Sequence, residues 1–362
     1  MDATDHSLLP ASDVVSATNA HADVHPGASA NATSSTTKCD SALHESMLET
    51  PDGVPELETD PIDYAAEEAE AALRSGFRIG FSEDRNRRYR RTMEDAHSYF
   101  YNFEEIEAQG WFAVFDGHAG KAAAEWCGNN LHETFAGILQ SQPARTVPEL
   151  MNEAFVETDK QLGERKGMFS GCTAVVGFVR LEDDRAVDST PSTNTTPGQP
   201  ADSLPVGETK PPRRRRVLYT ANVGDARAVL CRNGVAVRLS YDHKGSDQNE
   251  ARRVVETGGF VMNNRVNGVL AVTRSLGDLA MKEWVLGNPY TTETVLDDDD
   301  TFLILACDGV WDVCTDQEAV DLIKDIAEPQ QAAENLLDHA LAQFSTDNLS
   351  VLVIRFDKNT YE

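Results

Sequence analysis

Short apolar runs that border an acidic residue recur along this chain and predict its buried strands. Runs without polar alternation are typical of strands that are covered on both faces. Each of these runs borders one aspartate: 111–115 with Asp116, 217–224 with Asp225, 301–307 with Asp308, and 349–356 with Asp347. Antiparallel strands bring the end of one beside the start of the next, so we expect these carboxylates to meet at one rim of the core.

Amphipathic stretches lie between these runs and predict helices. Apolar residues recur at helical spacing in residues 121–139, 148–165, 246–257, 316–326 and 330–344. Shorter apolar runs predict further strands at 76–82, 96–103, 170–179 and 226–232. We expect residues 242–244, which are polar and lie between two of these elements, to form a surface turn.

Composition divides the chain into a tail, a core domain and an insertion. Of the 362 residues, 40% are hydrophobic, which is enough for a large core. Residues 1–75 are rich in Ala, Ser, Thr and Asp without apolar periodicity, so we expect a disordered tail there, with a short helix at 60–74. Residues 183–216, rich in Thr, Ser, Pro and Gly, predict a disordered insertion within a β-hairpin of the domain at 76–358.

The charge and the cysteines exclude several classes of protein. A formal charge of −28 opposes binding to nucleic acid. The six cysteines form no CxxC pair, so we expect reduced thiols. No signal-peptide pattern or membrane-length apolar run is present, which predicts a protein of the cytoplasm, and also of the nucleus, without a membrane partner. We expect it to be a monomer. The arginines at 213–216 fit a solvated loop end, or a nuclear or docking signal.

Charged clusters supply the candidate chemistry. Five arginines lie within residues 85–91, just before Glu94 and Asp95. They fit a solvated basic loop or a localisation signal, or a site for anions, because a guanidinium presents a planar fork that matches phosphate oxygens. Several carboxylates on one rim would repel one another unless cations neutralised them, which indicates hard divalent metals. The acidic run 297–300 lacks the glycine and glutamate of a calcium loop.

Seven motifs carry a resemblance to a known family. They stand in order at Arg90…Met93-Glu94-Asp95, Asp116-Gly117-His118-Ala119-Gly120, Gly224-Asp225-Ala226-Arg227, Arg265-Val266-Asn267-Gly268, Leu276-Gly277-Asp278, Asp308-Gly309-Val310-Trp311-Asp312 and Asp347-Asn348. From about residue 76 to 356, the chain resembles the metal-dependent protein phosphatases of type 2C (the PPM family). The run at 111–120 and the segment at 288–292 look closest to fungal members.

The resemblance implies a fold and an activity. The fold class is α+β, a four-layer α/β/β/α sandwich of two antiparallel sheets flanked by helix pairs, with metals in a cleft at one end. The activity is hydrolysis of phosphoserine and phosphothreonine in phosphorylated proteins by a water molecule that bridges two Mg²⁺ or Mn²⁺ ions. No covalent phosphoenzyme is needed. The fungal likeness further implies that MAP kinases of stress pathways are the substrates.

The same resemblance assigns metal ligands, residue by residue. Asp116 would bridge the two metals, and the carbonyl of Gly117 would add a ligand. Glu94 would serve one metal, and Asp308 and Asp347 would serve the other. Asp308 would also contribute to a weaker third-metal site.

The remaining assignments concern substrate and solvent. Asp95 matches a position that hydrogen-bonds metal-bound water, and Asp225 matches the third-metal site. Arg90 matches the arginine that binds phosphate, and Arg265 matches an arginine that contacts substrate. His118 matches the proposed general acid, which would protonate the departing alkoxide.

Departures from the family pattern leave a second function open. Residues 344–346 replace the usual glycine-serine turn, Cys172 replaces a common serine, and the segment after Asp278 diverges, so the substrate cannot be carried over. The alternative function is a catalytically silent phosphatase fold that acts as a binding or scaffold module. The intact acidic ligands argue against it. A cysteine-based phosphatase is excluded, because no cysteine has an arginine six residues later in an anion-binding loop.

Overall fold

The computed structural model of the protein describes residues 64–183 and 214–358, with side chains from residue 70 onward. Most of the predicted tail at 1–75 and most of the predicted insertion at 183–216 therefore lie outside the described residues. The described margins of both segments belong to regular secondary structure. Their predicted disorder stays a prediction.

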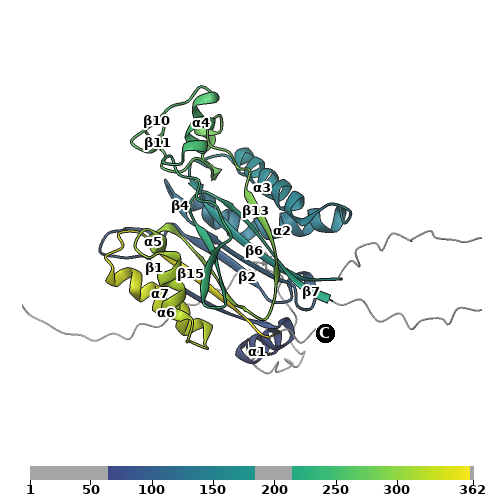
Figure 1. The fold of residues 1–362 in the computed structure, drawn as a ribbon. Helices are drawn as coiled ribbons and strands as arrows, with labels where there is room; N and C mark the ends of the chain where they lie inside the picture. Colours follow the sequence, from purple (N-terminus) through teal and green to yellow (C-terminus); the bar gives the residue numbers. More distant parts are fainter. Residues whose placement is uncertain (1–63, 184–213, 359–362) are drawn as a thin grey trace, which may run out of the picture. The chain divides into compact units, whose positions relative to one another are not determined.

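Two five-stranded antiparallel sheets form the centre of the domain (Figure 1). The first has the order β1 (Phe77–Asp84), β15 (Leu349–Phe356), β14 (Asp300–Ala306), β8 (Arg227–Arg232) and β9 (Val235–Arg238). The second has the order β13 (Tyr290–Leu296), β7 (Arg214–Val223), β6 (Ala174–Asp183), β3 (Gly110–Phe115) and β2 (Ala96–Phe100). The ladder between β6 and β7 extends to the pair Asp183 and Arg214, so the hairpin flanks the predicted insertion.

Helices cover the outer faces of both sheets. The second sheet carries α2 (Ala122–Ser141) and α3 (Val147–Glu164). The first sheet carries α5 (Asp308–Trp311), α6 (Asp316–Ile323) and α7 (Pro329–Ala342). These layers are the predicted four-layer α/β/β/α sandwich, and the α+β fold class is confirmed.

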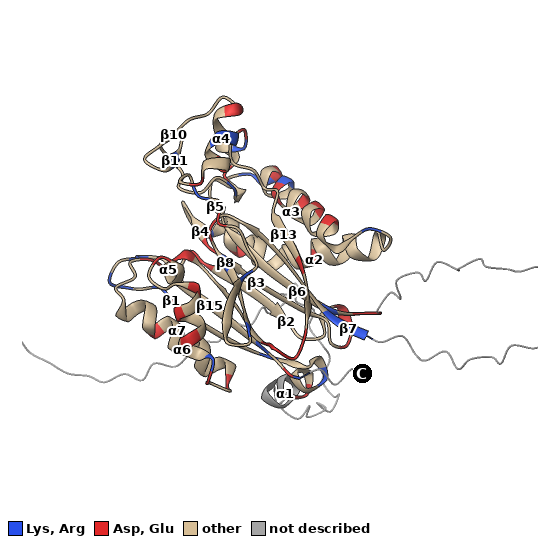
Figure 2. Cartoon of the chain, in the orientation of Figure 1, with Lys and Arg blue, Asp and Glu red and all other residues tan. Residues whose placement is uncertain are grey.

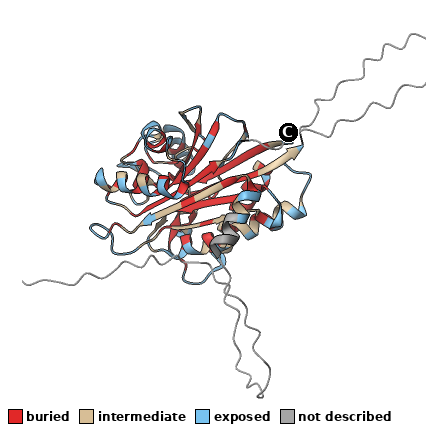
Figure 3. Cartoon of the chain, turned by 90° about the horizontal axis from the view of Figure 1, so that it is seen from below, coloured by how far each residue is buried: buried red, intermediate tan, exposed pale blue. Residues whose placement is uncertain are grey.

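Successive side chains of a central strand point to opposite faces of its sheet, and both faces are covered, so the strand is apolar throughout. In β3, Trp111, Ala113 and Phe115 pack under the helices, whereas Phe112 and Val114 face the other sheet. Because both faces are covered, every position of β3 is buried, and Figure 3 shows much of the central strands in red, the colour of buried residues. The uninterrupted apolar run at 111–115 is therefore the sequence signal of a central strand in this sandwich.

Smaller elements lie beyond the ends of the two sheets. They are α1 (Tyr64–Ser75), η1 (Phe103–Glu105), the strands β4 (Gly117–His118), β5 (Gly171–Cys172) and β12 (Leu276–Gly277) of a three-stranded sheet, α4 (Gln248–Glu256), the hairpin of β10 (Val261–Met262) and β11 (Arg265–Val266), and η2 (Leu279–Met281). The segment with α4 and the hairpin has a small core of its own, built on Val254, Val266 and Val285. None of the helices in the described ranges has the length and apolar character needed to cross a membrane.

Sequence signals explain where the predicted helices begin. Thr146 and Glu149 form a capping box at the start of α3, and Thr315 and Glu318 form one at the start of α6. The side chain of Asp247 accepts hydrogen bonds from two backbone amides at the start of α4. All six predicted helices are present, including the short one predicted at 60–74, with ends that differ by a few residues. The short helix α5 was not predicted, because its one turn is too brief to show a periodic pattern.

Two glycines should respond in opposite ways to alanine. In Gly80→Ala, the new Cβ would collide with the backbone of Pro329 at the start of α7, so we expect the free energy of unfolding to fall by about 1–3 kcal/mol. In Gly137→Ala, on the exposed face of α2, the Cβ meets no atom within 4 Å, and stability should rise by about 0.5–1 kcal/mol. Urea unfolding of both variants tests this packing. Equal effects would contradict the close contact between β1 and α7.

Candidate active site

Five aspartates come together at one end of the two sheets. Asp95 precedes β2, Asp116 follows β3, Asp225 follows β7, Asp308 follows β14, and Asp347 precedes β15. Burial raises the pKa of Asp116 well above its usual value, and the negative charges of the other four raise it further. The structure thus gathers these carboxylates where the antiparallel strands begin and end.

Other carboxyl groups on this rim show the same excess of negative charge. The pKa of Asp95 is raised to about 7, chiefly by burial, although the Ser350 hydroxyl donates a hydrogen bond to it at 2.8 Å. Burial raises the pKa of Asp308 as well, followed by the charges of Asp225 and neighbouring acids. Each group would release its proton more readily if positive charge were added to the rim.

Two cationic side chains already lie on this rim. The guanidinium of Arg90 donates to the carboxylate of Asp347 and, through Nε, to the carbonyl of Thr346 at 3.2 Å. The Lys244 ammonium lies 3.2 Å from Asp225 and 3.1 Å from Asp312. Burial would lower the pKa of Lys244, but these acids outweigh it and raise the pKa overall.

The loop that contains Lys244 is not the surface turn that the sequence predicts. His243 is only 1% exposed, and its backbone amide donates to the carbonyl of Gly224 at 2.9 Å. The prediction for residues 242–244 is therefore wrong. Tertiary packing against the end of β7 buries His243 and leaves Asp242 and Lys244 partly exposed, in a segment that carries no apolar pattern of its own.

Asn348 joins the metal-ligand candidates to the arginine-rich loop. Its side-chain oxygen accepts a hydrogen bond from the amide of Glu94 at 3.0 Å, and its nitrogen donates to the carbonyls of Arg85 and Thr92 at 2.8 and 3.1 Å. The Glu94 carboxylate in turn accepts from Thr92 and from the amide of Gly120 at 3.0 Å. Glu94 therefore lies at the rim, but its oxygens are engaged by neighbouring donors.

No group of three or more His, Cys, Asp or Glu side chains within the described ranges is arranged so that it could hold a metal ion as it stands. Ion pairs within the chain explain this absence in part, because Arg90 pairs with the carboxylate of Asp347 and Lys244 pairs with that of Asp225. The candidate ligands share a rim without converging on one point.

His118 is held by an aspartate from a distant part of the chain. Its Nε2 lies 2.7 Å from Oδ2 of Asp278, which also accepts a hydrogen bond from the Ser275 hydroxyl. The small sheet of β12, β5 and β4 brings the two residues together, and a Cβ at Gly171 would collide with the Asp278 carboxylate. The side chain of Asp278 thus fixes the imidazole beside Asp116.

Glycine is also required at residue 117. A Cβ at Gly117 would collide with the carbonyl oxygen of Glu94, so only glycine permits these two backbones to approach. The candidate carbonyl ligand and the candidate carboxylate of Glu94 are therefore neighbours through their main chains.

Arg265 is the one predicted site residue that the structure does not bring to the acidic rim. It is exposed on β11, and its guanidinium donates to the carbonyl of Val269 at 2.8 Å. Sequence reasoning also missed site neighbours: Lys244, Asp278, Asp312 and Asn348. The last three lie in motifs that the sequence displays, whereas Lys244 gives no comparable signal.

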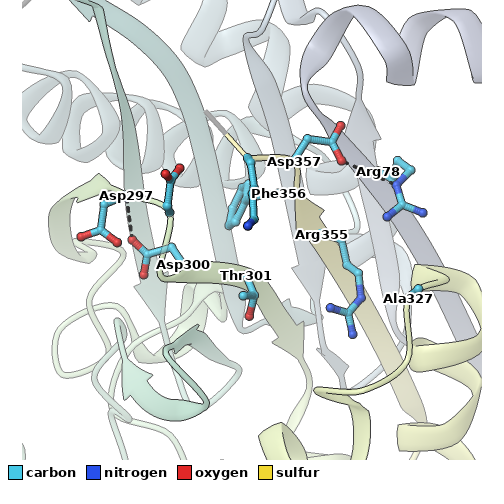
Figure 4. A pocket seen from close by; sticks show the side chains of 10 residues that line it. Arg78, Asp297, Asp300, Thr301, Ala327, Arg355, Phe356 and Asp357 are labelled. Atoms are coloured by element: carbon cyan, nitrogen blue, oxygen red, sulfur yellow. Dashed lines mark hydrogen bonds and ion pairs between the residues drawn. The ribbon is translucent and has the colours of Figure 1, made fainter. Parts of the chain in front are cut away.

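A polar hollow at the far end of the first sheet is separate from this rim (Figure 4). It lies where β14 begins and β15 ends, and Arg78, Asp300 and Arg355 are among its lining residues. Asp300 accepts hydrogen bonds from Arg232 at 2.8 Å, and Arg78 lies 3.8 Å from Asp357. Ion pairs within the chain therefore already engage Asp300 and Arg78 at this hollow.

Comparisons with known proteins agree with this architecture. Residues 79–349 match the family described as Protein phosphatase 2C. Two fungal proteins named Protein phosphatase 2C homolog 1 are each 45% identical to this chain. The match to the Schizosaccharomyces pombe protein spans 287 residues, which are 79% of this chain and 75% of that protein. The match to the Saccharomyces cerevisiae protein spans 278 residues, 77% of this chain and 93% of that protein.

Solved structures support the fold independently. A sex-determining protein of Caenorhabditis elegans superposes with a TM-score of 0.64 at 23% identity, covering 78% of this chain and 65% of that one. A phosphatase from Toxoplasma gondii superposes with a TM-score of 0.61 at 23% identity, covering 78% and 93%.

The sandwich fold and the family match together define a serine/threonine protein phosphatase. The chain belongs to the protein phosphatase 2C family, and relatives at 45% identity place it near fungal members, as the sequence motifs indicate.

Replacing Asp278 tests whether it positions His118. In Asp278→Asn, the imidazole loses its anionic partner, so we expect kcat on a small phosphate ester to fall about tenfold or more with little change in KM. Ser275→Ala is the matched control, because it removes only a hydrogen bond to the same carboxylate. An Asp278→Asn enzyme with normal kcat would contradict the positioning role.

Relative to a variant without this imidazole, the protein should lose stability as the pH is lowered through the range in which His243 resists protonation. Burial lowers the pKa of His243 to about 4 from its usual 6.5. Below pH 6.5 the imidazole of His243 is therefore protonated in the unfolded chain, whereas in the folded chain it stays neutral down to about pH 4. Between pH 7.5 and 5 this costs about 2 kcal/mol. Between pH 7.5 and 5, the free energy of unfolding of His243→Gln in urea should rise by about this amount relative to that of the unmodified protein, whereas the difference for His339→Gln on α7 should not change. Identical pH dependence in all three proteins would contradict this prediction.

Proposed function

We propose that the chain hydrolyses phosphoserine and phosphothreonine in proteins with Mg²⁺ or Mn²⁺ held by the acidic rim. One observation carries the proposal. Five aspartates at strand ends raise one another's pKa beside an arginine and a histidine. A surplus of hard oxygen donors without enough positive charge fits divalent cations and little else.

The family motifs would supply ligands for two cations and a weaker third. Asp116, the carbonyl of Gly117 and Glu94 would hold one ion, with Asp116 shared between two. Asp308 and Asp347 would complete the second ion. A third ion would take Asp225 and Asp308, and Asp95 would hydrogen-bond water at the first. The raised pKa values of these aspartates support this assignment, because added positive charge would relieve their repulsion.

The bound ions would supply a polarised bridging water as nucleophile and would offset the charge of the phosphate. The chain's own groups have the remaining roles. Arg90 presents its guanidinium to an oxyanion, here the carboxylate of Asp347, and would bind the oxygens of a phosphate in the same way. Phosphate and Asp347 would compete for that fork, so substrate binding would free Asp347 for a cation.

His118 would donate the proton that the departing serine or threonine oxygen needs. The carboxylate of Asp278 holds Nε2 of the ring at 2.7 Å, so Nδ1 is the nitrogen left for the substrate side. Arg265 would contact the substrate protein from β11, where its exposure leaves it accessible. The likeness to fungal members supports MAP kinases of stress pathways as substrates. The cytoplasm and nucleus remain the proposed locations, from the sequence pattern.

Release of inorganic phosphate from a phosphothreonine peptide tests the proposed activity. We expect release with Mg²⁺ or Mn²⁺, none with EDTA, and a loss of at least about a hundredfold in kcat in Asp308→Asn. The same variant should be at least as stable as the unmodified protein without metal, because a repelling carboxylate is gone. Asp338→Asn on the exposed face of α7 is the control.

Two outcomes would overturn the proposal. Metal-independent release, or normal turnover in Asp308→Asn, would contradict the metal assignment. No release from the unmodified protein with either metal would favour the alternative, a silent phosphatase fold that acts as a binding or scaffold module.

A further inference from the structure

Three arginines beside the candidate active site have no acidic partner among the described residues. Arg87, Arg88 and Arg91 are exposed on the loop between β1 and β2, and none of them forms an ion pair within the described ranges. The chain as a whole carries a formal charge of −28. A strongly acidic protein thus concentrates unpaired positive charge on one loop, seen in blue beside α5 in Figure 2.

The loop that carries these arginines is fixed at both ends. Asn86 is buried, and its side chain donates to the carbonyl of Ser345 at 2.6 Å. The amides of Tyr89 and Arg90 both donate to the carbonyl of Asn86, which closes a tight turn. The Asn348 side chain holds the carbonyls on either side of the turn, as described above. The arginines therefore project from an ordered base, which lowers the entropy lost when they bind an anion.

The loop places these arginines close to Arg90, the residue proposed to bind the phosphate that is hydrolysed. Arg91 adjoins Arg90, and Arg87 is three residues away, so their Cα atoms lie within roughly 11 Å of that of Arg90. An extended peptide advances about 3.3 Å per residue. An anionic group within about three residues of the phosphoresidue would therefore reach this surface.

We propose that Arg87, Arg88 and Arg91 form a second anion-binding subsite, which selects substrates with a further phosphoryl or carboxylate group within about three residues of the target. The proposal rests on the phosphatase function proposed above. Guanidinium groups bind either anion through paired hydrogen bonds, and they offset the repulsion between the acidic chain and an anionic substrate.

Three peptides test the subsite. Each has one phosphothreonine, and the residue two positions away is alanine, glutamate or phosphoserine. We expect kcat/KM of the unmodified enzyme at low salt to be about tenfold higher for the phosphoserine peptide than for the alanine peptide. The ratio should fall as salt is raised, because exposed charges are screened. In Arg87→Ala/Arg88→Ala/Arg91→Ala the ratio should drop below about threefold.

A charge-matched control removes three cations elsewhere. Arg78→Ala/Arg214→Ala/Lys358→Ala acts at the strand ends opposite the rim and should keep the full preference. The measured quantity is a ratio between peptides within one protein, so a uniform change in activity cancels. If Arg91→Ala disturbs Arg90, the double variant Arg87→Ala/Arg88→Ala should still lower the ratio.

Each result has one meaning. A gain from phosphoserine alone assigns the subsite to phosphoryl groups, and an equal gain from glutamate assigns it to carboxylates too. No gain from either anion, or a preference that survives in the triple variant, would overturn the subsite. If the unmodified enzyme hydrolysed none of the three peptides, the proposed phosphatase function itself would be rejected.

Discussion

The rest of the site depends on the mutual repulsion of carboxylates held on the ends of buried strands. Asp116 cannot move away from its neighbours, because β3 is packed on both faces and paired on both edges. The same holds for the aspartates that border β7, β14 and β15. Rigid packing thus keeps negative charges together that would separate on a flexible scaffold. Protein cations relieve part of the repulsion through Arg90 and Lys244, and divalent ions would relieve the remainder.

These two cations differ in what they tie to the rim. Arg90 belongs to the loop before β2, which Asn348 holds against the start of β15. Lys244 belongs to the loop that leads into the segment of α4 and the β10–β11 hairpin. Each ion pair therefore joins a peripheral segment to the strand ends. A change in the charge of the rim would alter how both the loop before β2 and the loop before α4 are held.

Most of the fold and part of the candidate site could be predicted from the sequence. Uninterrupted apolar runs located β3, β14 and β15, and helical periodicity located the long helices, because burial on fixed faces produces those patterns. The antiparallel sandwich itself followed from the family motifs, since periodicity does not determine which strands pair. Contacts between side chains that lie far apart in the sequence could not be predicted from periodicity or motifs. His118 and Asp278 meet only because three two-residue strands align, and Lys244 reaches the rim only because His243 anchors its loop to the end of β7.

The small core of Val254, Val266 and Val285 has a consequence for dynamics. It is separate from the three larger cores that hold the sandwich, so the α4 and hairpin segment has few apolar contacts to lose when it opens. We therefore expect this segment to open as a cooperative unit of its own, with an opening free energy below that of global unfolding. Amide hydrogens of α4 would then exchange with solvent through local opening while those of β3 stay protected. The part of the domain that carries Arg265 can thus adapt to different protein surfaces without loosening the strands that position the carboxylates.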